Sequence, residues 1–155
     1  MANFKTPQCQ LTTGYRPPIT PSEAGEVLAV RGKMTLPSTL AQNDIVEMVP
    51  LPAGCAPVDL IVDTDDLDSG TPAITLTAAI INSGGTDIVA NTEFFIASTV
   101  AQAGGIQRMD KKTGPRIASS TSTRNVGLKV VAAAGTAQAG EVGMTLLYRA
   151  ADFNE

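Results

Sequence analysis

The segment from Asn43 to Asn82 constrains the fold of this chain more than any other part. It reads NDIVEMVPLPAGCAPVDLIVDTDDLDSGTPAITLTAAIIN, with apolar and polar residues alternating in short runs. A period of two places apolar side chains on one face of a β-strand. The runs are interrupted by residue types that favour turns, namely Pro52, Gly54, Pro57, Gly70 and Pro72. This segment therefore predicts three short strands joined by turns.

Similar alternation continues on both sides of this segment. It predicts a long strand over residues 27–36, with Gly32 as a bulge. Residues 91–103 are compatible with a short helix capped by Asn91 and Thr92, but residues 93–97 also fit a strand. The full set of expected strands is 27–36, 45–49, 58–63, 73–81, 86–89, 106–109, 115–118, 125–132 and 141–149.

This spacing predicts an all-β fold of about eight strands, because turn signals recur every ~8–12 residues. Antiparallel sandwiches and barrels share such spacing, and long outer connections favour a jelly-roll-like β-sandwich. A length of 155 residues is enough for one domain with its own core. We place that domain at residues 26–155.

Residues 1–25 differ from the rest of the chain and predict an extended N-terminal arm. Four prolines stand among Thr and Gln residues, which favours extended backbone without a sheet ladder. Such an arm is either disordered or ordered by contact with another surface. Its scattered apolar residues are candidate partner-binding residues: Phe4, Leu11, Tyr15 and Ile19.

The charge content suggests that part of the surface is covered. Only 17% of residues are charged, against roughly 25% in an ordinary soluble domain. Copies of the chain or a partner would cover such a surface; the alternative is a monomer rich in uncharged polar side chains.

The net charge of −4 and the lack of a basic stripe argue against nucleic acid as a partner. The short apolar runs also argue against a membrane, because a spanning helix needs ~20 such residues. One basic cluster could contact an acidic partner, or could simply face water. It consists of Arg108, Lys111, Lys112 and Arg116.

The sequence offers little for catalysis, and we expect neither an enzyme nor a cofactor. The absence of histidine removes the commonest general base and nucleophilic triads. Cys9 and Cys55 are expected to be free thiols in a cytosolic product, since the start of the chain lacks a signal peptide.

The acidic run VDTDDLDSG raises the question of a calcium loop. It contains Asp63, Asp65, Asp66 and Asp68, but the EF-hand template fails. With Asp63 as first ligand, for example, the twelfth position is Ile74. We therefore predict a turn with local hydrogen bonds and no metal site.

Three stretches of the chain resemble head decoration, or cement, proteins of tailed bacteriophages. They are LPAGCAPVDLIVDTDDLDSGTPAITLTAAIIN, STVAQAGGIQRMDKKTGPRIASSTSTRNVGLKV and AAGTAQAGEVGMTLLYRA. The resemblance extends over residues 26–150. It implies a β-sandwich of jelly-roll type that binds the outside of the capsid, commonly as a trimer. The implied partners are the major capsid protein and further copies of the chain.

The resemblance also implies a virion protein on the capsid exterior, made in the host bacterial cytoplasm. One alternative is another phage structural component, such as a head fibre base or a tail protein. A carbohydrate-binding β-sandwich is a third hypothesis, which the aromatic content of 4% makes weaker because sugar platforms are usually aromatic.

Overall fold

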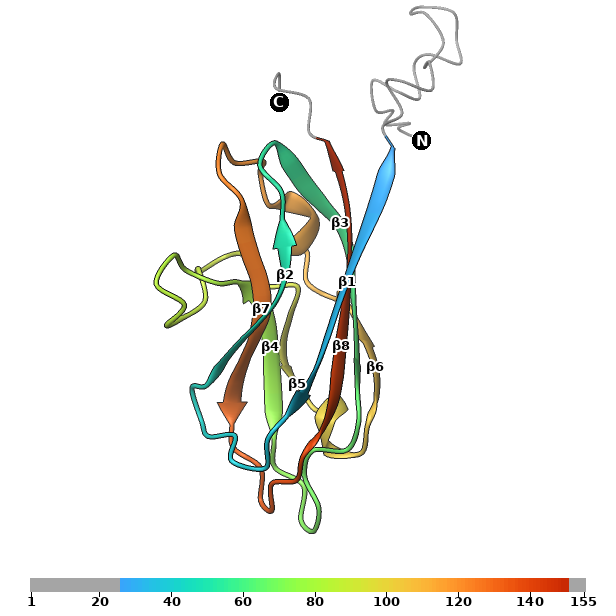
Figure 1. Ribbon diagram of the computed structural model, residues 1–155, viewed down its shortest axis with the longest axis vertical. Helices are drawn as coiled ribbons and strands as arrows, with labels where there is room; N and C mark the ends of the chain where they lie inside the picture. The colour runs from blue at the N-terminus through green and yellow to red at the C-terminus, as the bar shows by residue number, and fades with distance from the viewer. Residues whose placement is uncertain (1–25, 151–155) are drawn as a thin grey trace, which may run out of the picture.

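The computed structural model describes residues 26–150, which form a sandwich of two four-stranded antiparallel sheets (Figure 1). Two 3-10 turns, η2 (Val100–Gln102) and η3 (Gly114–Arg116), accompany the strands. The strands are β1 (Val27–Leu36), β2 (Ile45–Leu51), β3 (Cys55–Thr64), β4 (Thr75–Ile80), β5 (Phe95–Ser98), β6 (Gly105–Arg108), β7 (Arg124–Ala132) and β8 (Gly140–Ala150). The predicted all-β sandwich of about eight strands is confirmed. The predicted N-terminal arm lies outside the described residues.

The strand order is that of a jelly roll. One sheet has the order β1-β8-β3-β6, and the other has the order β2-β7-β4-β5. Consecutive strands lie in opposite sheets, except for β4 and β5. This winding gives the two interlocked Greek keys of a double-sheet jelly roll.

The core lies between the sheets and is mostly aliphatic. On β7, Val126, Leu128 and Val130 alternate inward, as do Val142, Met144 and Leu146 on β8, and all six are fully buried. Phe94 and Phe95 are the largest fully buried side chains among the described residues. Each such burial contributes roughly 1.5–3 kcal/mol, so the core can hold the sandwich together without tryptophan.

The edge strands β1 and β2 approach each other closely at Gly32. The expected bulge in β1 is wrong, because β1 pairs with β8 in an unbroken register. The bulge lies instead in β2, where the register with β7 shifts between Glu47 and Val49. A Cβ atom on Gly32 would stand 2.4 Å from the carbonyl oxygen of Met48, so only glycine fits here.

The short elements depart from the expected strands in three places. Residues 91–103 contain β5 followed by η2, so the strand alternative is nearer the structure than the helix. Residues 86–89 form only an isolated bridge, between Ile81 and Ile88. Residues 115–118 begin in η3 rather than in a strand, because Pro115 stands at the start of that turn, where its fixed φ suits a helical conformation.

The two ends of the sandwich differ in what they carry. Four connections between the sheets, residues 37–44, 65–74, 99–104 and 133–139, lie at the lower end in Figure 1, which we call the connection end. The start of β1 and the end of β8 lie at the opposite end, which we call the terminal end. Pairing of Cys55 with Ala150 brings the β2–β3 turn to the terminal end as well.

Candidate interaction surface

The acidic run 63–68 is a structural turn. The carboxylate of Asp65 accepts the backbone N–H of Glu141 at 2.8 Å, and that of Asp66 accepts the N–H of Asp68 at 2.9 Å. Asp63 pairs with an arginine on β1. Within residues 26–150, no group of three or more acidic, Cys or His side chains is arranged to hold a metal ion.

Asp68 joins two connections that are far apart in the sequence. Its buried carboxylate accepts the N–H groups of Ala73 (2.6 Å), Ile74 (2.9 Å), Gly135 (3.0 Å) and Thr136 (2.9 Å). These bonds favour the charged form, so the pKa of Asp68 lies well below its usual range, most strongly through the N–H of Ala73. The carboxylate therefore acts as a structural crosslink at the connection end.

The four cations with ion pairs among the described residues all lie on strands. Arg31 on β1 binds Asp63 on β3 through two bonds of 2.7 and 3.0 Å, and also donates to the hydroxyl of Thr145. This pair crosses β8 above Gly143, where a Cβ atom would stand 2.5 Å from the guanidinium. The hydrogen bond from Arg31 lowers the pKa of Asp63.

The other three ion pairs also tie separate segments together. They are Lys33 with Glu141 at 3.0 Å, Lys129 with Asp87 at 2.7 Å, and Arg108 with Asp59.

The predicted basic cluster divides into two parts in the structure. Arg108, at the end of β6, is occupied by its pair with Asp59, which lies 49 positions earlier in the chain. Lys111, Lys112 and Arg116 are exposed, and no ion pair of the described residues includes them. We call these three residues the basic loop. The four candidate residues of the arm, Phe4, Leu11, Tyr15 and Ile19, lie outside the described residues.

Arg124, at the start of β7, was not predicted as a site residue. Its guanidinium donates to the carbonyl oxygen of Ala118 at 2.8 Å, which holds the segment before β7 in place. Its Nε atom is buried and has no hydrogen-bond partner within the described part of the chain. Burial lowers the pKa of this guanidinium. An isolated arginine in a polar stretch gives no sequence signal for this position.

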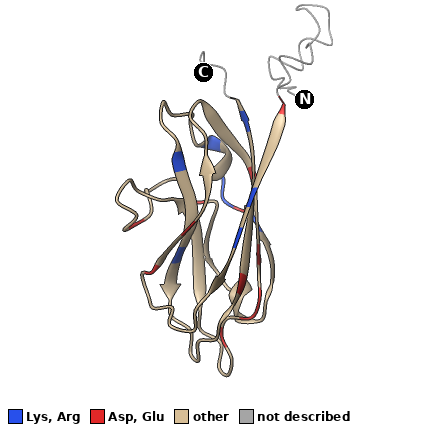
Figure 2. Ribbon diagram, in the orientation of Figure 1, with Lys and Arg blue, Asp and Glu red and all other residues tan. Residues whose placement is uncertain are grey.

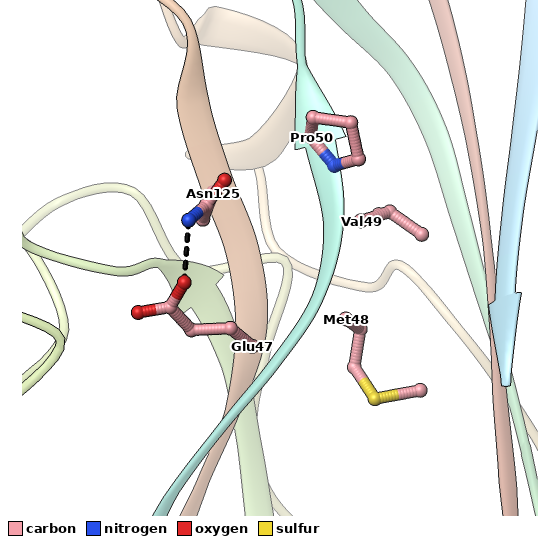
Figure 3. A pocket seen from close by; sticks show the side chains of 5 residues that line it. All are labelled: Glu47, Met48, Val49, Pro50 and Asn125. Atoms are coloured by element: carbon pink, nitrogen blue, oxygen red, sulfur yellow. Dashed lines mark hydrogen bonds between the residues drawn. The ribbon is translucent and has the colours of Figure 1, made fainter. Parts of the chain in front are cut away.

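Two hollows lie beside β2. The smaller, of about 200 Å³, is lined by Glu47, Met48, Val49, Pro50 and Asn125. Figure 3 shows Glu47 and Asn125 on one side of β2, joined by a hydrogen bond, and Met48 and Val49 on the other. The larger hollow, of about 320 Å³, lies near Glu47, Arg124 and Asn125 and is bordered by hydroxyl and amide side chains. In the larger hollow, the carboxylate of Glu47 accepts the amide of Asn125, and among the described residues no hydrogen bond joins it to a serine or threonine of the lining.

Exposed aliphatic side chains occur at both lateral edges of the sandwich. On β1, Val27, Leu28 and Met34 are 50, 45 and 42% exposed. Ile96 on β5 is 52% exposed and Ile106 on β6 is 71% exposed. β1 is the first strand of its sheet and β6 the last, while β5 is the last strand of the other sheet. Two more aliphatic side chains, Val89 and Val131 on β7, are exposed outside these edge strands.

The remaining sequence expectations concern thiols and membranes. Cys55 is a free, half-buried cysteine, and Cys9 lies outside the described residues. None of the helical segments between residues 26 and 150 has the length and apolar character required to cross a bilayer.

Two solved phage capsids contain chains similar to this one. A chain in the capsid of Ralstonia phage GP4 is 38% identical; the match covers 90% of this chain and 94% of that one, with a TM-score of 0.75. A chain in the capsid asymmetric unit of cyanophage Pam1 is 28% identical; the match covers 82% of this chain and 86% of that one, with a TM-score of 0.68. No family model matches the chain, and no curated protein sequence matches it.

Proposed function

This chain belongs to a family of bacteriophage capsid proteins, and we propose that it is a decoration, or cement, protein that binds the outer surface of the capsid. The single observation that carries the proposal is the similarity to the chain from the GP4 capsid, which spans nearly all of both chains. The proposed site of action is the virion exterior, after synthesis in the host bacterial cytoplasm. The proposed partner is the major capsid protein.

The closed core supports a decorating role over a role as shell-building subunit. Residues from both sheets fill one continuous apolar cluster, and the exposed aliphatic side chains are few and lie mostly at the lateral edges. Obligate assembly subunits tend to share large apolar interfaces that resemble a core cut in half. A domain that completes its own core can fold first and then add to a finished surface.

We further propose that three copies associate through the lateral edges. A ring needs two different surfaces on each copy, because its contacts are head-to-tail. The aliphatic side chains of β1 at one edge and of Ile96 and Ile106 at the other supply two such surfaces. Three linked copies would also bind the shell together, and avidity can exceed one contact's affinity by ~10²–10⁴-fold.

Adding the purified full chain to capsid shells that lack it tests the decoration role. We expect density on the outer surface by cryo-electron microscopy, arranged around threefold positions, and a solution mass of three chains. Labelled protein found on tails instead of heads would favour another structural component. A single-chain mass in solution and on the shell would rule out the trimer.

Deletion of residues 1–25 tests the role proposed for the arm. We expect the truncated chain to unfold at the same temperature as the full chain but to sediment less with shells. Among the described residues the core cluster lies within residues 36–146, so we expect the domain to keep its core after the deletion. Unchanged shell binding would show that the arm, including Phe4 and Tyr15, has no part in attachment.

A further inference from the structure

We infer that the terminal end of the sandwich faces the shell and docks the basic loop on an acidic surface of the capsid protein. The connection end then faces solvent. This inference rests on the proposed decoration role, and it adds an orientation and a chemistry for the contact.

The first observation is the set of cations that remain available to a partner. Arg31, Lys33, Arg108 and Lys129 are each held by an acid of the same chain. Lys111, Lys112 and Arg116 are exposed without such an acid among the described residues. A cation already paired with an acid of its own chain is less available to a partner. The three cations of the basic loop are therefore free to pair with carboxylates of an external acidic surface.

The second observation is the unequal distribution of charge between the two ends (Figure 2). The four connections of the connection end contain no Lys or Arg, but they contain Asp44, Asp65 and Asp66 as well as the buried Asp68. An acidic surface would repel this end, because like charges brought together at an interface disfavour binding. The charge alone therefore distinguishes one end from the other.

The basic loop begins near mid-height of the sandwich, where the backbone N–H of Met109 donates to the carbonyl oxygen of Leu60 in β3, and its segment continues to the terminal end. The basic loop belongs to the segment 109–123, and Ser120 of this segment accepts the N–H of Gly54 in the β2–β3 turn at 2.8 Å. Figure 1 shows η3, which contains Arg116, in the upper part of the sandwich. Arg124 pairs with Leu51 at the end of β2, and Arg149 pairs with Ala56 near the start of β3. Both arginines therefore also lie near the terminal end. The acids in this region are Glu26, Asp110, Glu47, which lines a hollow together with Arg124, and Glu93, whose carbonyl oxygen accepts the hydroxyl of Thr113 beside the basic loop.

The third observation is where the rest of the chain departs. β1 begins at the terminal end, so residues 1–25 join the sandwich there. They contain two cations, one acid and the apolar residues Phe4, Leu11, Tyr15 and Ile19. Twenty-five residues can reach at most about 80–90 Å, so they can extend over the surface on which the basic loop rests. β8 ends at the same end, and the five residues that follow it in the sequence include two acids.

A charge-matched pair of variants tests the inference with the full-length chain. The first variant is Lys111→Gln, Lys112→Gln, Arg116→Gln, which removes three cations from the basic loop. The control is Ser38→Glu, Thr39→Glu, Thr71→Glu, which adds three acids at exposed positions of the connection end. Both variants change the net charge from −4 to −7, so the size of the change is matched while its location differs. Circular dichroism and thermal unfolding confirm that each variant is folded.

Co-sedimentation with undecorated shells, across a range of salt concentrations, is the measurement. We expect the loop variant to bind about tenfold more weakly than the parent chain, and the control to stay within about twofold. Affinity of the parent should fall as ionic strength rises from about 0.05 to 0.5 M, and the loop variant should show a smaller fall.

The outcomes separate the orientation from the function. If the parent chain does not bind shells, the decoration role itself fails. If the parent binds and the loop variant binds equally well, or the control loses more affinity, the orientation is wrong. Binding that nuclease treatment of the shells removes would mean that the loop contacts nucleic acid, which also overturns the inference.

Lysine acetylation of bound and free protein gives an independent readout without mutation. Lys111 and Lys112 should be protected from acetylation on the shell. Equal modification of these two lysines in the bound and free states would contradict docking through the basic loop.

Discussion

Replacing Gly32 with alanine should destabilise the sandwich at the junction of its edge strands. The added Cβ atom would stand 2.4 Å from the carbonyl oxygen of Met48 and 3.0 Å from a methyl group of Val49. The nearest atom belongs to the backbone of β2, so a side-chain rotation cannot remove the clash. β1 would have to move away from β2, and its unbroken register with β8 would resist that movement.

The size of the effect follows from two opposing terms. Overpacking of this kind costs about 1–3 kcal/mol. Alanine in place of glycine inside a strand raises the free energy of unfolding by about 0.5–1 kcal/mol, because alanine loses less backbone freedom on folding. We expect a net loss of about 1–2 kcal/mol in the free energy of unfolding. With an unfolding entropy of about 0.26 kcal/mol per kelvin for the 125 residues from 26 to 150, Tm should fall by about 4–8 °C.

Calorimetry or denaturant titration of the full chain measures this loss. Gly84→Ala is the matched control, because its Cβ atom would find nothing closer than 3.6 Å in an exposed turn. We expect the control to be neutral or slightly stabilised. A Gly32→Ala variant as stable as the control would refute the reasoning that the sheets meet too closely here for a side chain.

Three further predictions concern stability. Ala97→Gly should stabilise the domain by about 1 kcal/mol, because Ala97 has a φ of +49°; a lower unfolding temperature would contradict the assigned strain. The pKa of Asp68 is lower in the folded chain than the value of about 3.9 for an unfolded aspartate. Its carboxylate therefore contributes fully to the free energy of unfolding above about pH 3.9, and this contribution is lost as pH falls through the folded pKa. The unfolding temperature of the parent should therefore fall more steeply below about pH 4 than that of Asp68→Asn; parallel pH profiles would exclude this role. Millimolar calcium or EDTA should leave the unfolding temperature unchanged, since the oxygens of Asp65, Asp66 and Asp68 already accept backbone N–H groups; a calcium-dependent rise would show that the acidic run binds the ion.

Period-two alternation was enough to predict the long strands and the sandwich. Val126, Leu128 and Val130 lie inward as the pattern indicates, because a half-buried strand must separate its two faces. The short strand β6 lies one residue from the predicted strand 106–109, whereas β5 has too few residues for the pattern to decide between helix and strand. Their structure depends on contacts such as the hydrogen bond between Ser98 and Gln107, which joins the two sheets.

The residues of the candidate surface could be predicted from the sequence, but their ion-pair and hydrogen-bond partners could not. The sequence identified the basic cluster, yet the separation of Arg108 from the basic loop depends on Asp59, a partner 49 positions away. Likewise, local bonding in the acidic run was expected, but the two bonds from Asp68 to residues 135 and 136 reach across about half of the described chain. Tertiary contacts of this length leave no trace in local spacing.

The pairing of β1 with β8 determines when the domain can be completed during synthesis. β8 lies between β1 and β3 in its sheet, so the first and last described strands must meet before that sheet closes. Contacts so distant in sequence make folding slow, because a long loop must be closed before they form. A chain released before residue 140 would leave β1 and β3 with open edges, which invite pairing with other chains. Translation of the last strand is therefore the step that turns an aggregation-prone intermediate into a finished domain.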